Sequence, residues 1–176
     1  MSTAPRVFTA ANFRRICNEL AKKDKHLASI IKEHGHPPMW TRKPTFQTLI
    51  LFILEQQVSL AAAYAAFEKL RQKIGYVTPA KILAMTDEEL RSCYFSRQKI
   101  VYARELAAAV KSRRFSIKEM ASLPDEEVRK KMIVLKGIGH WTIDVYLMHC
   151  LQRTDLFPLG DIALVNSLKE TKNLPK

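Results

Sequence analysis

A single aspartate, Asp161, stands at the start of a helical pattern, "LGDIALVNSL", late in the 176-residue chain. An aspartate in this position accepts hydrogen bonds from the first amides of the helix, and the positive helix end favours its carboxylate form. If Asp161 also faces a cleft, the anion can stabilise positive charge on a sugar whose base departs, or direct a water to the anomeric carbon. The residues leave two interpretations open, a simple helix cap and a catalytic carboxylate.

Two closely spaced glycines precede a long apolar run in "LKGIGHWTIDVYLMHC" (135–150). We expect one helix to end near Leu135, the next to begin at about His140, and Gly137 and Gly139 to take backbone angles that a side chain would resist. This is a helix–hairpin–helix pattern, and the amides that it frees can cradle a phosphate. An ordinary turn between two helices has the same glycine spacing, so that alternative stays open.

The charge of the chain favours a polyanionic partner. Lys and Arg number 29 against 17 Asp and Glu, which gives a formal net charge of +12, dispersed in short groups such as "KSRR" (111–114). A solvated basic surface would have the same composition, so charge raises the question of nucleic acid without deciding it. The length and the 47% hydrophobic content fit one domain or two closely packed lobes.

The sequence indicates neither disulfide or metal-binding cysteines nor a membrane-spanning segment. Cys17, Cys93 and Cys150 are odd in number and far apart, which fits neither a disulfide framework nor zinc or iron–sulfur spacing. The N-terminal residues do not have the pattern of a secretory signal, and the apolar run 49–54 is far shorter than the roughly 20 residues needed to span a bilayer. We expect a soluble intracellular protein, in the cytoplasm or nucleoid of a bacterium or the nucleus of a eukaryote.

The elements that must position these residues have a helical period almost throughout. Residues 9–35 predict one or two amphipathic helices, with Gly35 as a C-cap. Residues 44–75 predict a buried helix and an Ala-rich helix divided at an N-cap, Ser59. Shorter helical units follow, one of them with Pro124 and acidic residues in its first turn. No strand alternation and no repeat are found, so the sequence predicts an all-α fold.

Several coupled motifs resemble a known family. "LEQQVSLAAA", "MTDEELRS", "FSRQKIVYARELA", "LPDEEV", "LKGIGHWTIDVYLMHCL" and "DLFPLGDIAL" occur in that order and spacing. Together, over roughly residues 30–170, they resemble the helix–hairpin–helix GPD superfamily of DNA glycosylases, in the 3-methyladenine (alkylpurine) DNA glycosylase II branch. The resemblance implies a single domain over 1–176, with a central helical lobe at about 46–150, a second lobe from the N- and C-terminal segments, and a DNA-binding cleft between them. It also implies one or two more helices after the aspartate than this chain contains.

The resemblance also implies roles for the two opening motifs. Asp161 matches the essential aspartate of the family, and Gly137, Gly139 and His140 match the DNA-binding hairpin, with histidine where relatives commonly have proline. Trp141 stands where lyase-active members have a Schiff-base lysine, which implies a monofunctional enzyme. Trp141 can also stack on a cationic alkylated base, or merely anchor the hairpin. The backbone carbonyls of Leu135 and Ile138 match a monovalent cation site for Na⁺ or K⁺.

Further positions have weaker assignments. Gln57 matches the side chain that enters the minor groove and fills the gap left by a flipped nucleotide, although Gln56 and Ser59 of the same turn can simply cap a helix. Arg97 and Lys99, at another helix start, are expected to contact phosphate. Pocket walls are expected among the aromatic residues, with core packing as the alternative for each of them; the candidates are Trp40, Tyr64, Tyr94 and Phe95.

The function that the resemblance implies is base-excision repair. Such an enzyme flips an alkylated purine, for example 3-methyladenine, out of damaged double-stranded DNA and hydrolyses its glycosidic bond, leaving an abasic site. We expect a monomer that requires no cofactor and binds no membrane. Two alternatives stay open: a non-catalytic DNA-binding helix–hairpin–helix module, and a glycosylase for other damaged bases.

Overall fold

The computed structural model describes residues 6–175, and within that range it confirms the all-α prediction. No strand forms among the described residues; the nearest feature is an isolated antiparallel bridge between Val7 and Arg153. The ten α-helices and one 3₁₀ turn of the described residues are α1 (Phe13–Lys23), α2 (Lys25–His34), α3 (Phe46–Glu55), α4 (Leu60–Ile74), α5 (Pro79–Ala84), α6 (Asp87–Ser92), α7 (Arg97–Lys111), η1 (Glu119–Ser122), α8 (Asp125–Ile133), α9 (His140–His149) and α10 (Ile162–Lys172).

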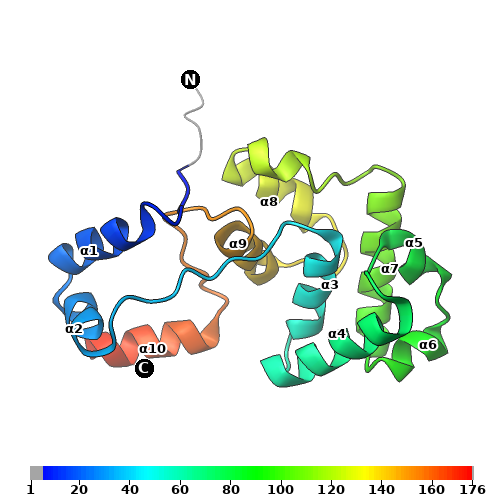
Figure 1. Cartoon of the computed structure of the whole chain (residues 1–176), viewed down its shortest axis with the longest axis horizontal. Coiled ribbons are helices and arrows are strands. Elements are labelled where there is room, and N and C mark those ends of the chain that lie inside the picture. Colours follow the sequence, from blue (N-terminus) through cyan, green and yellow to red (C-terminus); the bar gives the residue numbers. More distant parts are fainter. Residues whose placement is uncertain (1–5, 176) are drawn as a thin grey trace.

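The core lies in the group of helices from α3 to α9 (Figure 1). α3 is apolar nearly all round, and nine of its ten residues are buried. A helix of this composition is stable only when other elements surround it. Here α4, α7 and α9 pack on α3. This buried helix ends at Glu55, so the core fixes the position of the turn that follows it.

Polar residues at the helix starts explain where the elements begin. Ser59 caps α4 as predicted, with its hydroxyl accepting a hydrogen bond from the amide of Ala62. Thr86 and Glu89 form a reciprocal capping box at α6, and Ser96 caps α7. Pro124 precedes α8 and leaves three acidic residues in its first turn. The Ser and Thr caps satisfy amides that have no partner inside the helix.

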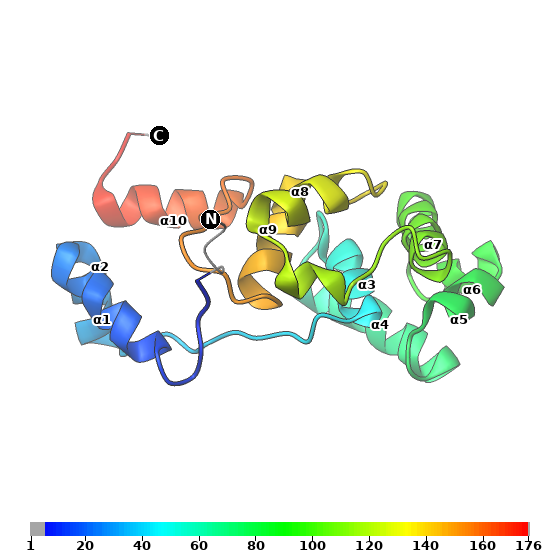
Figure 2. The same cartoon turned by 90° about the horizontal axis from the view of Figure 1, so that it is seen from above.

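The N- and C-terminal helices form a second group at the other end of the molecule from α4–α7 (Figures 1 and 2). The predicted helical region 9–35 divides into α1 and α2 at Asp24, and Gly35 is the C-cap as expected. The carboxylate of Asp24 caps α2 and also accepts a hydrogen bond from Lys172 of α10. The hydrogen bond from Lys172 is the main cause of the lowered pKa of Asp24. This link therefore persists until the pH falls through that lowered pKa.

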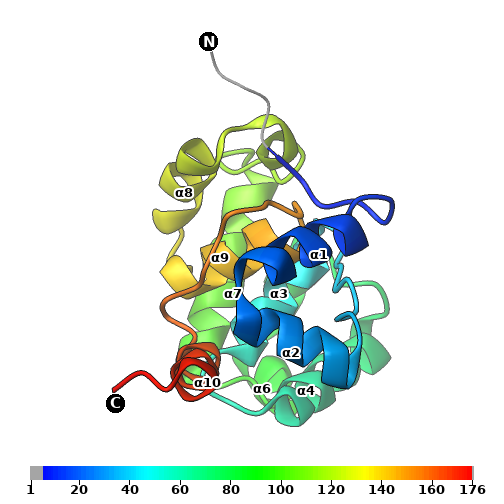
Figure 3. The same ribbon diagram turned by 90° about the vertical axis from the view of Figure 1, so that its left-hand side faces the viewer.

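The second group differs from the first in burial. None of α1, α2 and α10 contains a buried residue. Viewed from this end of the molecule, α1, α2 and α10 lie in front of α3 and α7 (Figure 3). Exposed apolar side chains, including Leu20 and Ile162, remain on this group. These helices thus contribute little to the core.

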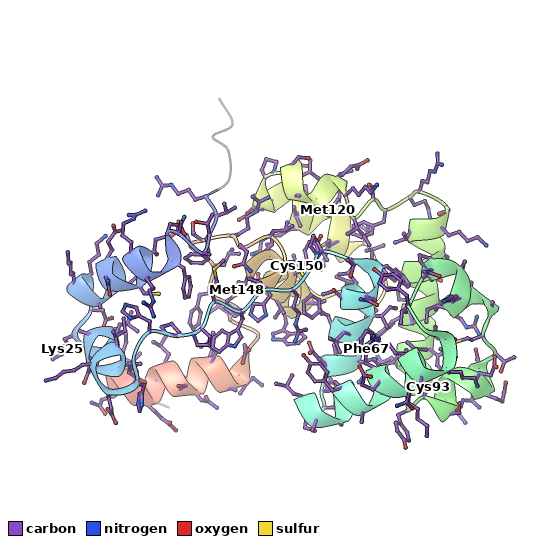
Figure 4. All side chains as sticks on the ribbon, viewed as in Figure 1. Lys25, Phe67, Cys93, Met120, Met148 and Cys150 are labelled. Carbon is purple, nitrogen blue, oxygen red and sulfur yellow. The ribbon has the colours of Figure 1, made fainter. Side chains whose placement is uncertain are left out.

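The cysteines are free thiols, as the sequence predicts. Cys93 lies in the α3–α9 group, whereas Cys150 lies near the centre of the molecule beside Met148 (Figure 4). Burial raises the pKa of the Cys150 thiol to about 12, with Arg42 opposing the shift. No helix within residues 6–175 is long and apolar enough to cross a membrane.

A buried arginine anchors the segment that leads from α9 to α10. Arg153 is 3% exposed, and its guanidinium donates hydrogen bonds to the carbonyls of Ala121 (3.2 Å) and Leu123 (2.8 Å). Its Nε lies 3.0 Å from Asp125 Oδ1. The two groups form an ion pair, although their geometry is not that of a hydrogen bond. The arginine therefore joins the start of α8 to the segment that carries the chain on to Asp161.

We predict that Arg153→Met lowers the free energy of unfolding by about 2–4 kcal/mol, because it leaves two carbonyls and a carboxylate without their partner. Urea denaturation measures the change. The matched control is Arg71→Met, whose ion pair with Glu68 is half exposed, and which should change stability by less than about 1 kcal/mol. Equal effects of the two substitutions would contradict the anchoring role of Arg153.

Candidate active site

A cleft of about 800 Å³ lies where the end of α3, the starts of α7, α9 and α10, and the α8–α9 turn come together. The glycine hairpin and Asp161 both line it. The residues around it are Glu55, Gln56, Gln57, Gln98, Lys99, Tyr102, residues 133–139, Trp141, Thr142, Gly160, Asp161 and Ile162. Regions separated by more than a hundred residues in sequence therefore share one concave surface, which is the usual form of a ligand site.

The hairpin between α8 and α9 turns at Gly137. This residue has φ +86°, a left-handed conformation that favours glycine, and a Cβ there would lie 2.1 Å from the ring of Tyr102. Gly139 is different, because its φ of −100° is extended and a Cβ there would meet nothing within 4 Å. The prediction that both glycines need unusual backbone angles is therefore wrong for Gly139. The turn imposes the constraint at Gly137 alone.

The start of α9 is open to the cleft. Gly139 is its N-cap and offers no side chain to bond the first amides, and both Gly139 and His140 are exposed. Amides at a helix start that no side chain caps combine with the helix dipole to favour an anion. This end of the cleft therefore has the chemistry expected of a phosphate-binding hairpin.

Asp161 is the N-cap of α10 and lines the cleft as well. Its Oδ1 accepts a hydrogen bond from the amide of Leu164 at 3.0 Å, and its side chain is partly exposed. Gly160 explains its proximity to the hairpin, because a Cβ at that position would lie only 3.3 Å from Trp141 Cβ. Asp161 therefore caps α10 and faces the cleft at the same time.

Trp141 and two lysines are the other cleft residues that bear on chemistry. Trp141 is partly buried in the first turn of α9, beside Gly160. Lys136 is exposed in the hairpin. Lys99 donates from Nζ to the carbonyl of Leu54 at 2.7 Å, and burial lowers the pKa of its ammonium. The contact that Lys99 makes in this structure is with the end of α3, whereas the sequence predicts phosphate contact.

The turn after α3 holds two glutamines in different environments. Gln57 is exposed with φ +57°, at the position predicted to enter the minor groove. Gln56, for which helix capping was one alternative, is the C-cap of α3, and its side-chain amide also donates to the carbonyl of Gly137 (2.8 Å) and to Thr142 Oγ1 (3.1 Å). No local pattern in the sequence signals this contact, because its partners lie more than eighty residues away.

Other predicted site residues lie outside this cleft. Trp40 is 65% exposed in the segment before α3, and Tyr64 is 45% exposed on α4. Tyr94 is exposed with the ammonium of Lys69 4.2 Å from its ring centroid, whereas Phe95 belongs to the core. Arg97 is exposed at the first position of α7 but does not line the cleft. Tyr102, which was not predicted as a pocket residue, lines the cleft instead.

An ion pair braces the two helices of the hairpin. Arg129 Nη2 of α8 lies 2.6 Å from Asp144 Oδ1 of α9, and Asp144 is buried. Removing one member of such a pair leaves a charge without a partner, so the pair favours the observed packing of α8 on α9. This brace was also missed from the sequence, where Asp144 stands inside an apolar run.

The fold and the motifs agree with the comparisons to known proteins. The model of the HhH-GPD superfamily base excision DNA repair proteins matches residues 50–176. The chain therefore belongs to that superfamily. The matched residues include the hairpin and Asp161.

Two bacterial and yeast proteins are similar to this chain in sequence. The chain is 32% identical over 151 residues to YfjP of Bacillus subtilis, which covers 81% of this chain and 53% of that protein. It is 30% identical over 156 residues to DNA-3-methyladenine glycosylase 1 of Schizosaccharomyces pombe, which covers 86% of this chain and 68% of that protein. The chain thus spans about half of the length of the Bacillus relative.

A solved structure shows the same arrangement. The S. pombe 3-methyladenine DNA glycosylase Mag1 in complex with abasic DNA superposes with a TM-score of 0.81 at 28% identity. The superposition covers 92% of this chain and 82% of Mag1. The helical architecture is therefore shared over nearly the whole length.

We predict that Gly137→Ala destabilises the fold by about 2–4 kcal/mol, because the new Cβ meets the Tyr102 ring in a left-handed backbone. Gly139→Ala is the matched control: its extended backbone and open surroundings accept a methyl group, whereas alanine is a poorer N-cap than glycine, so stability should change by no more than about 1 kcal/mol. Thermal unfolding of both variants measures the difference, and a larger loss for Gly139→Ala would refute the assignment of the constraint to Gly137.

Proposed function

We propose that this chain is a monofunctional DNA glycosylase of base-excision repair that removes alkylated purines such as 3-methyladenine. The observation that carries the proposal is that Asp161 shares one cleft with the open start of α9 and with Trp141. A carboxylate, an anion site and an aromatic face are the groups that hydrolysis of an extruded purine nucleotide requires. The relatives named as 3-methyladenine glycosylases support the same substrate class.

In the proposed complex the hairpin holds the duplex by its backbone. The open amides at the start of α9 bind a phosphate, with Gly139 permitting close approach and His140 beside it. The exposed Gln57 enters the minor groove at the gap that the flipped nucleotide leaves. Arg97, exposed at the start of α7, adds a contact to phosphate. Damaged double-stranded DNA is thus the partner, bound by one copy of the chain.

Asp161 supplies the proposed electrostatic catalysis. An alkylated purine carries positive charge and leaves with the electrons of the glycosidic bond, while positive charge develops on the sugar. A fixed carboxylate near the anomeric carbon stabilises that charge, and water then adds there and loses a proton, leaving an abasic site. The hydrogen bond from Leu164 holds the carboxylate in one orientation. A cationic leaving group needs little general acid, so one anion suffices.

Trp141 supplies stacking instead of an amine. Its ring borders the cleft beside Gly160, where an electron-poor alkylated base can stack on the π-face. Without an amine at this position the chain has no counterpart to the Schiff-base lysine of the lyases, so the reaction ends at hydrolysis.

The hairpin also fits a structural monovalent cation, Na⁺ or K⁺. The carbonyl of Leu135 accepts one hydrogen bond, from the amide of Ile138 at 3.0 Å, and keeps a second lone pair. Leu135 and Ile138 both border the cleft. Carbonyl oxygens are ligands that suit hard cations. The ion would rigidify the turn, and no chemical step depends on it.

We predict that Asp161→Asn reduces excision of 3-methyladenine by on the order of a hundredfold or more, the scale of one preorganised electrostatic group. Asparagine retains the oxygen that caps α10, so the fold and the affinity for DNA with an abasic-site mimic should be nearly unchanged. Single-turnover excision from methylated DNA, at matched thermal stability, measures the effect. Asp155→Asn, an exposed aspartate outside the cleft, is the control. An Asp161→Asn variant as fast as the parent would favour the DNA-binding module.

We also predict that no lyase step follows base removal. Borohydride added during turnover should trap no protein–DNA adduct, and strand breaks should appear only after alkali or heat. A trapped adduct would overturn this assignment and point to Lys99 or Lys136, the two lysines of the cleft. Substituting each by methionine would then identify the nucleophile.

A further inference from the structure

We propose that Gln56 is a positioning residue that couples the turn after α3, which carries Gln57, to the hairpin. Gln57 then enters the minor groove at a fixed distance from the hairpin that holds the DNA backbone. The inference rests on the proposed function, because it concerns the extrusion step of that reaction. Gln56 does not touch the reacting atoms in this scheme. It acts through the residues on either side of it.

The contacts of Gln56 join two DNA-facing elements. Its amide nitrogen has two hydrogens, and it donates to the carbonyl of Gly137 at 2.8 Å and to Thr142 Oγ1 at 3.1 Å. One acceptor lies in the hairpin turn and the other, 2% exposed, in the first turn of α9. Both donor positions are therefore used on the same motif.

The acceptor at Gly137 is held in place from the other side. The ring of Tyr102, from α7, covers the Cα of Gly137 so closely that a Cβ would overlap it. The hydroxyl of Tyr102 in turn accepts a hydrogen bond from Gln98. The hairpin carbonyl is thus fixed between α7 and the amide of Gln56, and it provides a rigid reference point for the turn after α3.

Gln56 is joined to Gln57 through the backbone of the turn after α3. Gln57 follows Gln56 directly, in a left-handed conformation with φ +57°, and Ser59 then caps α4. Non-glycine residues populate this conformation sparsely, so neighbouring contacts must maintain it. Because Gln56 is the C-cap of the buried α3, its side chain fixes both the direction of the turn and the distance of Gln57 from the hairpin.

Loss of the amide should separate binding from extrusion. The amides at the start of α9 and the Arg129–Asp144 ion pair do not involve Gln56, so phosphate binding by the hairpin should be retained when Gln56 is replaced. The turn that carries Gln57, however, is then no longer held at a fixed distance from the hairpin. Insertion must then order the turn at the moment of extrusion, which costs conformational entropy.

The experiment compares Gln56→Leu with the parent and with Gln72→Leu, a matched control at an exposed position of α4. Duplex affinity is measured by fluorescence anisotropy, extrusion by the fluorescence of 2-aminopurine next to the lesion, and chemistry by single-turnover excision of 3-methyladenine. For Gln56→Leu we expect extrusion and excision to fall about ten- to a hundredfold, the scale of two lost hydrogen bonds. Affinity for undamaged duplex should change less than about threefold, which is at the low end of the effect of one such bond.

A double-mutant cycle separates positioning from general destabilisation. Thr142→Val removes one acceptor at nearly constant volume, and its effect on extrusion should disappear in the Gln56→Leu background. Gln56→Glu retains the size of the side chain without the donors, so it should also lose extrusion, and it provides the test if Gln56→Leu does not fold. A parallel loss of melting temperature, affinity and excision would indicate a merely structural role and overturn the inference.

The outcomes distinguish this inference from the proposed function. If the parent protein releases no base from methylated DNA, the proposed function fails, whereas the 2-aminopurine signal still measures the coupling. If the parent excises 3-methyladenine but Gln56→Leu extrudes the nucleotide as well as the parent, the inference alone fails. Additive effects in the Gln56–Thr142 cycle would also contradict it.

Discussion

The absence of a Cβ at Gly137 is the constraint on which the candidate site depends. Its left-handed backbone lets the hairpin turn, and its bare Cα lets the ring of Tyr102 lie against the turn. Its carbonyl meanwhile accepts the amide of Gln56 from the end of α3. Three parts of the chain far apart in sequence are therefore fitted to one residue. These contacts hold the hairpin against α3 and α7.

The two helices that begin at the cleft are capped in opposite ways, and this difference separates their roles. α9 begins at a glycine that leaves its first amides for an external anion. α10 begins at Asp161, whose own carboxylate satisfies an amide. The charge of an anion is therefore favoured at the first helix start and opposed by the carboxylate at the second. The close contact of Gly160 with Trp141 holds these two starts next to each other.

The features predicted correctly from the sequence were those written in local patterns. Helical period and caps such as Ser59 and Gly35 located the elements, and the "GIG" and "GD" motifs located two sides of the cleft. The error at Gly139 arose because spacing shows that a turn exists but not which glycine takes the positive φ. Contacts between distant segments, such as Gln56 with Gly137 and Arg129 with Asp144, leave no local signal. The outward positions of Trp40 and Tyr64 likewise depend on packing that composition does not specify.

The two sides of the cleft differ in how firmly the fold holds them. The hairpin stands on the buried core through α3, α7 and α9, whereas Asp161 begins a helix with no buried residue. Local stability follows buried contacts, so α10 opens at a lower free-energy cost than the hairpin. The link between Lys172 and Asp24 and the packing of Gly160 on Trp141 limit that motion at the two ends of α10. The cleft therefore has one wall that the core holds, at the hairpin, and one wall that opens more readily, at the start of α10.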